Sequence, residues 1–281
     1  MNDDEPELAA RFTPMAQHRM SESGGRQGPD GGGLVTGQGA ETVQPIRVGH
    51  IDLSFHDAAA REVERVLTAR CLTVERSTAP HEEMYRRMGR GEVDVLVSAW
   101  LPTSHGRYLA PFEDEVLKVT VLYEPYCIWG VPDYVPEDDV AEIADLLKPP
   151  ALQRMERLIQ GINPGAGISR FSESIVQQYG LDEQGYVFRT GTEAQCFGRF
   201  TQAVADGRWV VIPLWHPQWL HHRYRIRELR DPKQLLGGKD QATLIVRRDA
   251  AQRIGVAAIG ELEAMHLGNA RVSELDDLLR R

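Results

Sequence analysis

Aromatic side chains mark the places in this sequence where we expect short strands to give way to loops. Trp100 and Trp215 each follow a short apolar run, and Tyr126 and Trp129 lie in a segment bounded by prolines. Ligands of open α/β sheets bind just beyond the carboxyl ends of strands. The electron-rich faces of aromatic rings attract cations, and quaternary ammonium groups are typical occupants of aromatic cages. Rings that converge from different strands in this way predict a box for a ligand cation.

Packing of a loop against the core is the alternative role for each ring, because indole carries a large apolar face. We expect ligand contact for Trp100 and Trp215. For Trp129 both roles stay open, since the sequence IWGVP fits a core strand equally well. Trp209 precedes the apolar run VVI and is expected in the core, and Trp219 is expected to pack rather than to bind.

Three histidines close to Trp215 in the sequence raise the question of a metal site: His216, His221 and His222. The side chains of His221 and His222 are sequence neighbours that diverge on a helix, and no carboxylate lies at a useful spacing. We therefore predict no metal site in this segment.

The glycine loop at 161–167, GINPGAG, opens onto a predicted helix. It lacks both the GK[ST] ending of a P-loop and the GxGxxG pattern of a dinucleotide site. We expect a tight turn whose free backbone N–H groups line a cleft, and no cofactor.

An enzyme would need a nucleophile with a base, or paired carboxylates, in the same cleft. The candidates are Ser98, Ser104 with His105, and Asp52 with Asp57. None of them forms a recognisable catalytic motif, so we predict a binding protein rather than an enzyme.

Composition narrows the class of partner. The chain has 281 residues and a formal net charge of −9, with no basic run, which argues against nucleic acid or an anionic membrane surface. No segment approaches the roughly 18 to 20 consecutive apolar residues of a membrane span, so we predict a chain that does not itself cross a membrane. Cys71, Cys127 and Cys196 lack CxxC spacing and are expected as buried free thiols, which suit a reducing compartment.

The pattern of elements predicts an α/β protein. Residues 1–44 are rich in Gly, Ser and Gln and are expected to be a disordered leader. Strands are predicted at 46–49, 72–75 and 93–97, with amphipathic helices between them, which is the unit of a parallel sheet. Further along we expect a helical region over 135–160, a buried parallel strand at 209–214, and two helices at the end of the chain.

Three motifs in order along the chain resemble the substrate-binding components of glycine betaine and related quaternary-amine ABC transporters, the OpuAC or ProX-like family. They are GEVDVLVSAWLPTSH, GINPGAG followed by YGL, and WHPQWL with LRDP. The resemblance spans about residues 46–281, nearly all of the part expected to be ordered.

The resemblance implies a type II periplasmic-binding-protein fold, with two α/β lobes and a ligand cleft between them. Lobe 1 would comprise residues 46–122 and 232–281, and lobe 2 residues 123–231. By the same resemblance, Trp100, Trp129 and Trp215 are the cage candidates, with Tyr126 as a fourth wall.

The ligand's acid group is met in this family by backbone amides after the first strand and by a polar side chain. In this chain those positions are Gly49, His50 and Ile51, together with Gln218. Gln218 stands where the family pattern has histidine, and Leu53 to Phe55 replace a tryptophan that the family often has after the first strand.

Function follows from the resemblance as an expectation: reversible capture of a small quaternary-ammonium solute of the glycine betaine class, with a permease and an ATPase as partner subunits. The first 20 residues show no apolar signal core, whereas the family is periplasmic or anchored outside the membrane. Localisation therefore stays open, and a cytoplasmic solute sensor on the same fold is the alternative.

Overall fold

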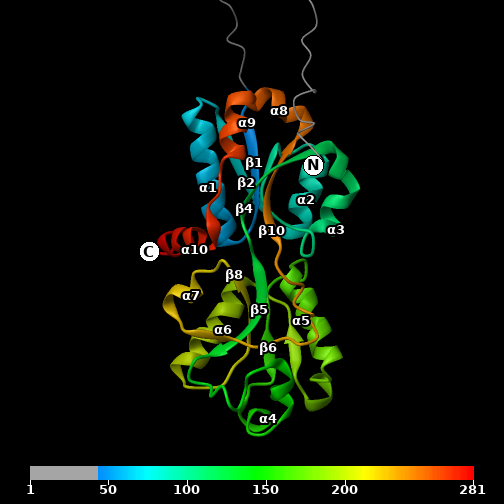
Figure 1. The fold of residues 1–281 in the computed structure, drawn as a ribbon, viewed down its shortest axis with the longest axis vertical. Helices are drawn as coiled ribbons and strands as arrows, with labels where there is room; N and C mark the ends of the chain where they lie inside the picture. Colours follow the sequence, from blue (N-terminus) through cyan, green and yellow to red (C-terminus); the bar gives the residue numbers. More distant parts are fainter. Residues whose placement is uncertain (1–43) are drawn as a thin grey trace, which may run out of the picture. The chain divides into compact units, whose positions relative to one another are not determined.

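The computed structural model describes residues 44–281, so the predicted leader falls almost wholly outside the described residues. The described chain starts with alternating strands and helices (Figure 1). These are β1 (Ile46–Ile51), α1 (Ser54–Ala69), β2 (Val74–Ala79), α2 (His81–Gly89) and β3 (Val95–Leu101). The predicted strands and helices of this region are confirmed, with bounds that differ by a few residues.

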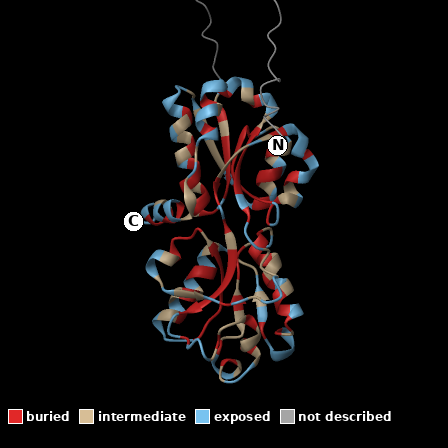
Figure 2. Cartoon of the chain, in the orientation of Figure 1, coloured by how far each residue is buried: buried red, intermediate tan, exposed pale blue. Residues whose placement is uncertain are grey.

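A five-stranded sheet holds this first part together, in the order β2-β1-β3-β10-β4. Strands β1, β2 and β3 are parallel, whereas β10 (Gln241–Arg247) runs antiparallel between β3 and β4 (Val116–Tyr123). Every residue of β3 is buried, as expected of a central strand covered on both faces. Figure 2 shows buried residues concentrated on the central strands between the helices. The carboxyl ends of the three parallel strands therefore meet at one edge of the sheet.

The segment between β4 and β10 builds two smaller sheets. Strands β5 (Tyr126–Pro132), β8 (Ile212–His216) and β9 (Ile226–Glu228) pair in the order β8-β5-β9. The short strands β6 (Leu158–Gln160) and β7 (Val187–Arg189) pair with each other in parallel. The predicted lobe boundaries at residues 122 and 232 stay a prediction.

Two sequence-based expectations for this segment are wrong. The predicted strand at 209–214 starts only at Ile212, and it pairs antiparallel to β5 rather than in a parallel sheet. The predicted helical region over 135–160 holds the 3-10 helix η2 (Ile143–Leu147), the single turn α4 (Ala151–Arg154) and strand β6. Prolines at 149 and 150 remove backbone donors there, which prevents one continuous helix despite the apolar periodicity.

The helices that matter for the site are α5 (Gly167–Gln178), α6 (Glu193–Ala205) and α7 (Leu220–Arg223). Three helices close the chain where two were expected: α8 (Arg248–Ile254), α9 (Val256–Glu263) and α10 (Gly268–Leu278). Helix α10 packs against both α1 and α7. The remaining short elements are α3 (Gly106–Leu109), η1 (Ala110–Glu115) and η3 (Asp182–Gln184).

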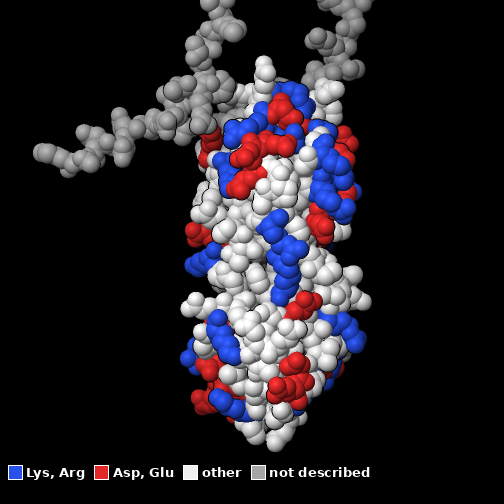
Figure 3. Space-filling view, turned by 90° about the vertical axis from the view of Figure 1, so that its right-hand side faces the viewer, with Lys and Arg blue, Asp and Glu red and all other residues white. Residues whose placement is uncertain are grey.

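Acidic and basic side chains lie next to one another on the face in Figure 3, in keeping with ion pairs such as Arg90 with Glu92 at 2.7 Å. None of the helices within 44–281 is both long and apolar enough to span a bilayer. Cys127 and Cys196 are buried free thiols as predicted, but Cys71 is exposed.

Candidate ligand-binding site

A small cavity brings together residues that are far apart in the sequence. Its volume is about 20 Å³, room for about one water molecule. The lining residues come from the starts of α1, α2 and α5, from the end of β3 and the loop after it, from β5 and β8, and from the loop after β6. None of the described residues that line it is Asp, Glu, Lys or Arg. The cavity is therefore an uncharged, mostly apolar site.

Three aromatic rings form one part of the cavity wall. The ring of Phe55 lies 5.5 Å from that of Trp100 and 5.8 Å from that of Trp215, both measured between centroids. The indole N–H of Trp100 donates to the Tyr123 hydroxyl at 3.2 Å. The indole nitrogen of Trp215 is buried and has no hydrogen-bond partner among residues 44–281. The three rings thus line the cavity from two sheets and a helix.

Three buried histidines form a second part of the cavity wall: His56, His81 and His105. The His81 and His105 rings are 5.3 Å apart, and the Trp100 backbone N–H donates to Nδ1 of His105 at 3.0 Å. Burial lowers the pKa of all three imidazoles, that of His81 to about 4. All three are therefore neutral at pH 7. Within the described part of the chain, no group of three or more His, Cys, Asp or Glu side chains is arranged to hold a metal ion.

The start of α5 forms a third part of the wall. Ala166, Gly167 and Ile168 line the cavity, and this helix has neither a side-chain cap nor an acid in its first turn. The first N–H groups of a helix have no partner within the helix and favour negative charge. A Cβ on Gly167 would lie 2.8 Å from Oγ of Ser104, so glycine is needed for this close approach. The end of the predicted glycine loop and the uncapped first turn of α5 therefore lie at the cavity wall.

The structure brings Trp100 and Trp215 into the same cavity, but Trp129 and Tyr126 do not line it. Trp129 is fully buried, and its indole N–H donates to Oγ of Ser172 at 2.8 Å. The Tyr126 ring stacks on His216 with centroids 4.7 Å apart. Of the two roles left open for Trp129, this position is that of a core residue.

The residues predicted to meet the acid group also lie outside the cavity. Gly49 and Ile51 are packed in the sheet, and a Cβ on Gly49 would lie 2.6 Å from Sδ of Met84. The backbone N–H of Gln218 donates to Ser273 at 3.1 Å, and its side-chain oxygen accepts from Trp219 N–H at 2.8 Å. Gln218 therefore holds its own loop against α10.

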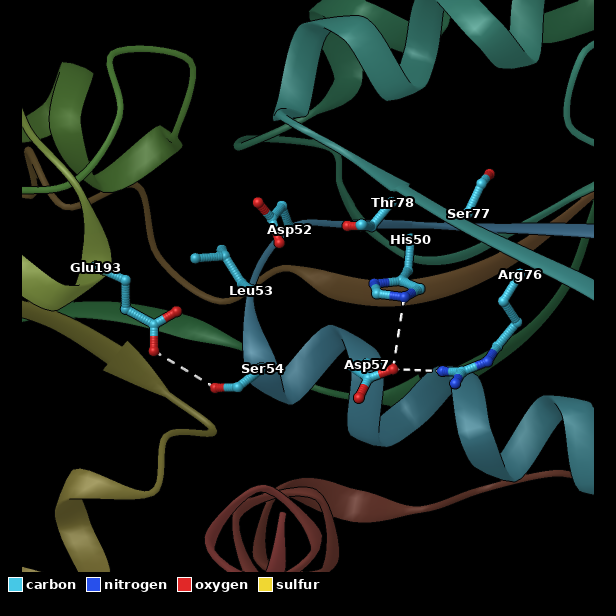
Figure 4. A pocket seen from close by; sticks show the side chains of 9 residues that line it. All are labelled: His50, Asp52, Leu53, Ser54, Asp57, Arg76, Ser77, Thr78 and Glu193. Atoms are coloured by element: carbon cyan, nitrogen blue, oxygen red, sulfur yellow. Dashed lines mark hydrogen bonds and ion pairs between the residues drawn. The ribbon is translucent and has the colours of Figure 1, made fainter. Parts of the chain in front are cut away.

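His50 faces a different hollow, shown in Figure 4. This open hollow has a volume of about 490 Å³ and is lined mainly by polar side chains. Nε2 of His50 lies 3.6 Å from the Asp57 carboxylate, which also pairs with Arg76. At its other end Ser54 Oγ lies 3.4 Å from Glu193. The charges in this hollow are largely paired with one another.

Sequence reasoning missed Phe55, His56 and His81 as cavity residues. The signal was present: Phe55 and His56 follow β1 within a few residues, and His81 follows β2 after a single proline. Since β1, β2 and β3 are parallel, these positions lie at the same sheet edge as Trp100.

Comparison with known proteins gives the same family as the motifs. A family model described as the substrate-binding domain of ABC-type glycine betaine transport systems matches residues 44–280. The chain belongs to this family. A curated relative, the glycine betaine/carnitine transport binding protein of Listeria monocytogenes, is 28% identical over 96 residues, which is 34% of this chain and 32% of that protein. The match thus spans about a third of that relative's length.

Solved structures of glycine betaine-binding and choline-binding proteins share the fold of this chain. The glycine betaine/L-proline-binding protein of Borrelia burgdorferi has a TM-score of 0.74 at 23% identity, over 84% of this chain and 87% of that one. Lactococcal OpuAC, closed on glycine betaine, has a TM-score of 0.73 at 20% identity, over 84% and 90%. A choline-binding protein in complex with choline has a TM-score of 0.70 at 16% identity, over 83% of each chain. The predicted type II periplasmic-binding-protein fold is confirmed.

Proposed function

We propose that this protein captures a small quaternary-ammonium solute of the glycine betaine class in the cavity, as the substrate-binding component of an ABC importer. The main observation in support is that Trp100, Trp215 and Phe55 line one cavity that has no charged lining residue. A trimethylammonium group donates no hydrogen bonds and is held by aromatic faces. Phe55 is the third aromatic ring at this cavity, in place of Trp129, which the resemblance names as a cage candidate.

A neutral cavity favours a ligand whose own charges balance, because burying an unpaired charge is costly. The free N–H groups of Gly167 and Ile168 supply donors for an acid group opposite the rings. His105 adds another donor: its Nδ1 accepts from Trp100, so the proton of the neutral ring is on Nε2. These groups take the place of Gly49, His50, Ile51 and Gln218 as the proposed acid-binding residues.

A cavity of about 20 Å³ is too small for a quaternary amine, so the walls must separate for the ligand to enter. Closure on the ligand would then present one defined shape to partner subunits. In an importer those partners are a permease pair and the ATPase that drives it.

Isothermal titration of the folded protein with glycine betaine, proline betaine, carnitine and choline tests the proposal. Replacing Trp100 or Trp215 by Ala should weaken binding by about 1 kcal/mol or more, since a cation–π contact contributes about 0.5 to 2 kcal/mol. Circular dichroism of each variant checks that it is folded. Absence of binding for all four solutes would rule out the proposed ligand class.

A further inference from the structure

Arg170 lies on α5, one turn beyond the residues of that helix that line the cavity. It is partly buried, and it does not itself line the cavity. Burial lowers the pKa of Arg170 below its usual 12.5, but a guanidinium stays protonated at pH 7. A permanent positive charge therefore lies beside the part of the wall where we propose that the acid group binds, and the proposed function gives this charge no role.

The Arg170 guanidinium is bonded to two segments of the cavity wall. One of its amino groups donates to the carbonyl oxygen of Gly165 at 2.7 Å, and the other donates to the carbonyl oxygen of Ser104, also at 2.7 Å. Ser104 lines the cavity, and Gly165 comes two residues before Gly167, which also lines it. The two segments are in contact, since a Cβ on Gly167 would lie 3.3 Å from Cα of Ser104. The charge thus lies next to the wall at two points.

Arg170 has backbone carbonyls as partners instead of an acid. Among residues 44–281 it forms no ion pair with an Asp or Glu. Glu173 on the same helix is exposed, so water and salt screen its charge. Asp240 is buried on the other side of Ser104, and its two carboxylate oxygens accept the backbone N–H groups of Thr103 and Ser104 at 2.7 and 2.9 Å. The positive charge is therefore not neutralised by direct contact with a carboxylate.

The charge of Arg170 acts on residues that line the cavity. Burial is the main cause of the shifted pKa values of three of them, and the positive charge of Arg170 lowers the pKa of each one as well. They are His81, His105 and Cys127. These residues come from α2, from the loop after β3 and from β5, so the field of Arg170 reaches the cavity from behind its wall. A carboxylate in the same cavity would be attracted by this field.

We propose that Arg170 makes the site selective for quaternary amines that carry a carboxylate over those that carry an alcohol, because its unpaired positive charge lies beside the start of α5. This inference rests on the proposed function and concerns the same cavity. Arg170 acts through the wall and does not touch the ligand. Glycine betaine represents the carboxylates and choline the alcohols; choline also carries a net positive charge, which the guanidinium repels.

A purely structural role is the alternative for Arg170. Its bonds to Gly165 and Ser104 join segments that the sequence assigns to different lobes, so their loss would loosen the wall for every ligand. The two roles give different results. A loosened wall weakens both solutes by the same factor, whereas a lost charge weakens the carboxylate alone.

Titration calorimetry of glycine betaine and choline at pH 7 with Arg170→Gln and Arg170→Lys tests the inference. Gln still donates to a carbonyl but has no charge, so the ratio of betaine to choline affinity should fall at least about fivefold, because protein screens a nearby charge less than water does. Lys keeps the charge, so the ratio should stay close to that of the wild type even where both affinities fall. If choline binds too weakly for direct titration, its affinity is measured by competition with bound betaine.

Arg107→Gln is the matched control for the loss of one arginine. Cζ of Arg107 lies 4.9 Å from the centroid of the Tyr108 ring, and Cζ of Arg170 lies 5.8 Å from the same centroid. Arg107 is exposed, so solvent screens its charge and the affinity ratio should not change. Circular dichroism checks that each variant is folded.

The outcomes separate the inference from the proposed function. Equal losses of both affinities in Arg170→Gln, or a fall in the ratio that is as large in Arg170→Lys or Arg107→Gln, would overturn the inference while leaving the proposed function intact. Arg170→Met is a second neutral variant. If both neutral variants fail to fold while Arg170→Lys folds, Arg170 is a structural residue and the inference is overturned. If the folded wild type binds none of the four solutes, the inference and the proposed function are both overturned.

Discussion

The rings of Trp100, Phe55 and Trp215 differ in the contacts that hold them. Trp100 is fixed by its N–H bond to Tyr123, whereas Phe55 is held by its place in the first turn of α1. The indole N–H of Trp215 has no acceptor within 44–281, although the side chain is only 1% exposed. A buried donor without a partner costs about 1 to 3 kcal/mol, so a ligand oxygen or a water that reaches it would gain that amount. Trp215 thus lines the cavity and also has an indole N–H that is free to donate a hydrogen bond.

Trp129 provides a direct test of which indoles belong to the site. Trp129→Phe should leave the affinity for glycine betaine unchanged, because Trp129 does not line the cavity. The free energy of unfolding should fall by about 1 to 3 kcal/mol, since Oγ of Ser172 loses the N–H that donates to it at 2.8 Å. Urea unfolding and calorimetric titration of the same sample measure the two effects.

Trp215→Phe is the comparison for that experiment. It keeps a ring in the wall but reduces the aromatic face, so the affinity should fall several-fold. If Trp129→Phe lost as much affinity as Trp215→Phe, Trp129 would have to be counted among the residues that contact the ligand.

At the scale of single residues, the sequence pointed to some of the residues that line the cavity. Trp100 and Trp215 were found because a tryptophan directly after an apolar run is conspicuous. Phe55 and His81 were missed because a phenylalanine in a helix and a histidine after a proline are ordinary on their own. They become site residues only through the pairing of β2, β1 and β3, which places three strand ends side by side.

Among the elements, Asp94 links two strands and a helix. Its carboxylate accepts the backbone N–H of Arg47 on β1 at 2.8 Å and the guanidinium of Arg253 on α8 at 2.6 Å. Burial alone would raise the pKa of Asp94, but the hydrogen bonds from Arg47 and the charge of Arg253 hold it below its usual value. The ionised form therefore stabilises the contact of β1, the start of β3 and α8.

This gives a prediction for stability against pH. Because the folded-state pKa of Asp94 lies below the ordinary value of 3.8, its contribution is fully present above about pH 4 and is lost as the pH falls through the lowered pKa. Asp94→Asn should cost about 1.5 to 3 kcal/mol at pH 7 and much less at pH 2. Urea unfolding at pH 7, 4, 3 and 2 measures the difference.

Asp182→Asn, at an exposed position, is the control for the loss of one charge. Its free energy of unfolding should stay within about 0.5 kcal/mol of the wild type at pH 7. A stability difference between wild type and Asp94→Asn that does not shrink at low pH would contradict the role given to the ionised carboxylate.

The elements themselves were predictable to different degrees. The alternation from β1 to β3 was predicted because parallel α/β units carry apolar strands and amphipathic helices of regular length. The region 135–160 was not, because its apolar periodicity matched a helix while prolines at 149 and 150 stopped one from forming. The direction of β8 depends on its pairing with β5, which no local pattern encodes.

Several polar contacts join segments that the sequence assigns to different lobes, and one of them involves Arg280 near the end of the chain. Ser54 begins α1 and Glu193 begins α6, and Arg280 donates to both side chains, with 2.6 Å to Ser54 Oγ. The Arg280 guanidinium also lies 4.6 Å from the centroid of the Trp219 ring. We infer that this closing contact must break, at least in part, whenever the cavity opens for a ligand.

The closing contact leads to a kinetic prediction. A cavity of about 20 Å³ admits no quaternary amine, so binding has to wait for an opening step. In stopped-flow tryptophan fluorescence, the observed rate should level off with rising glycine betaine instead of increasing linearly. Arg280→Ala removes the shared cation and should raise the plateau rate, whereas Arg281→Ala, with a side chain 69% exposed, should leave it unchanged. A linear rise in the wild type would mean that the cavity is already open in solution, and an unchanged plateau in Arg280→Ala would mean that other contacts limit opening.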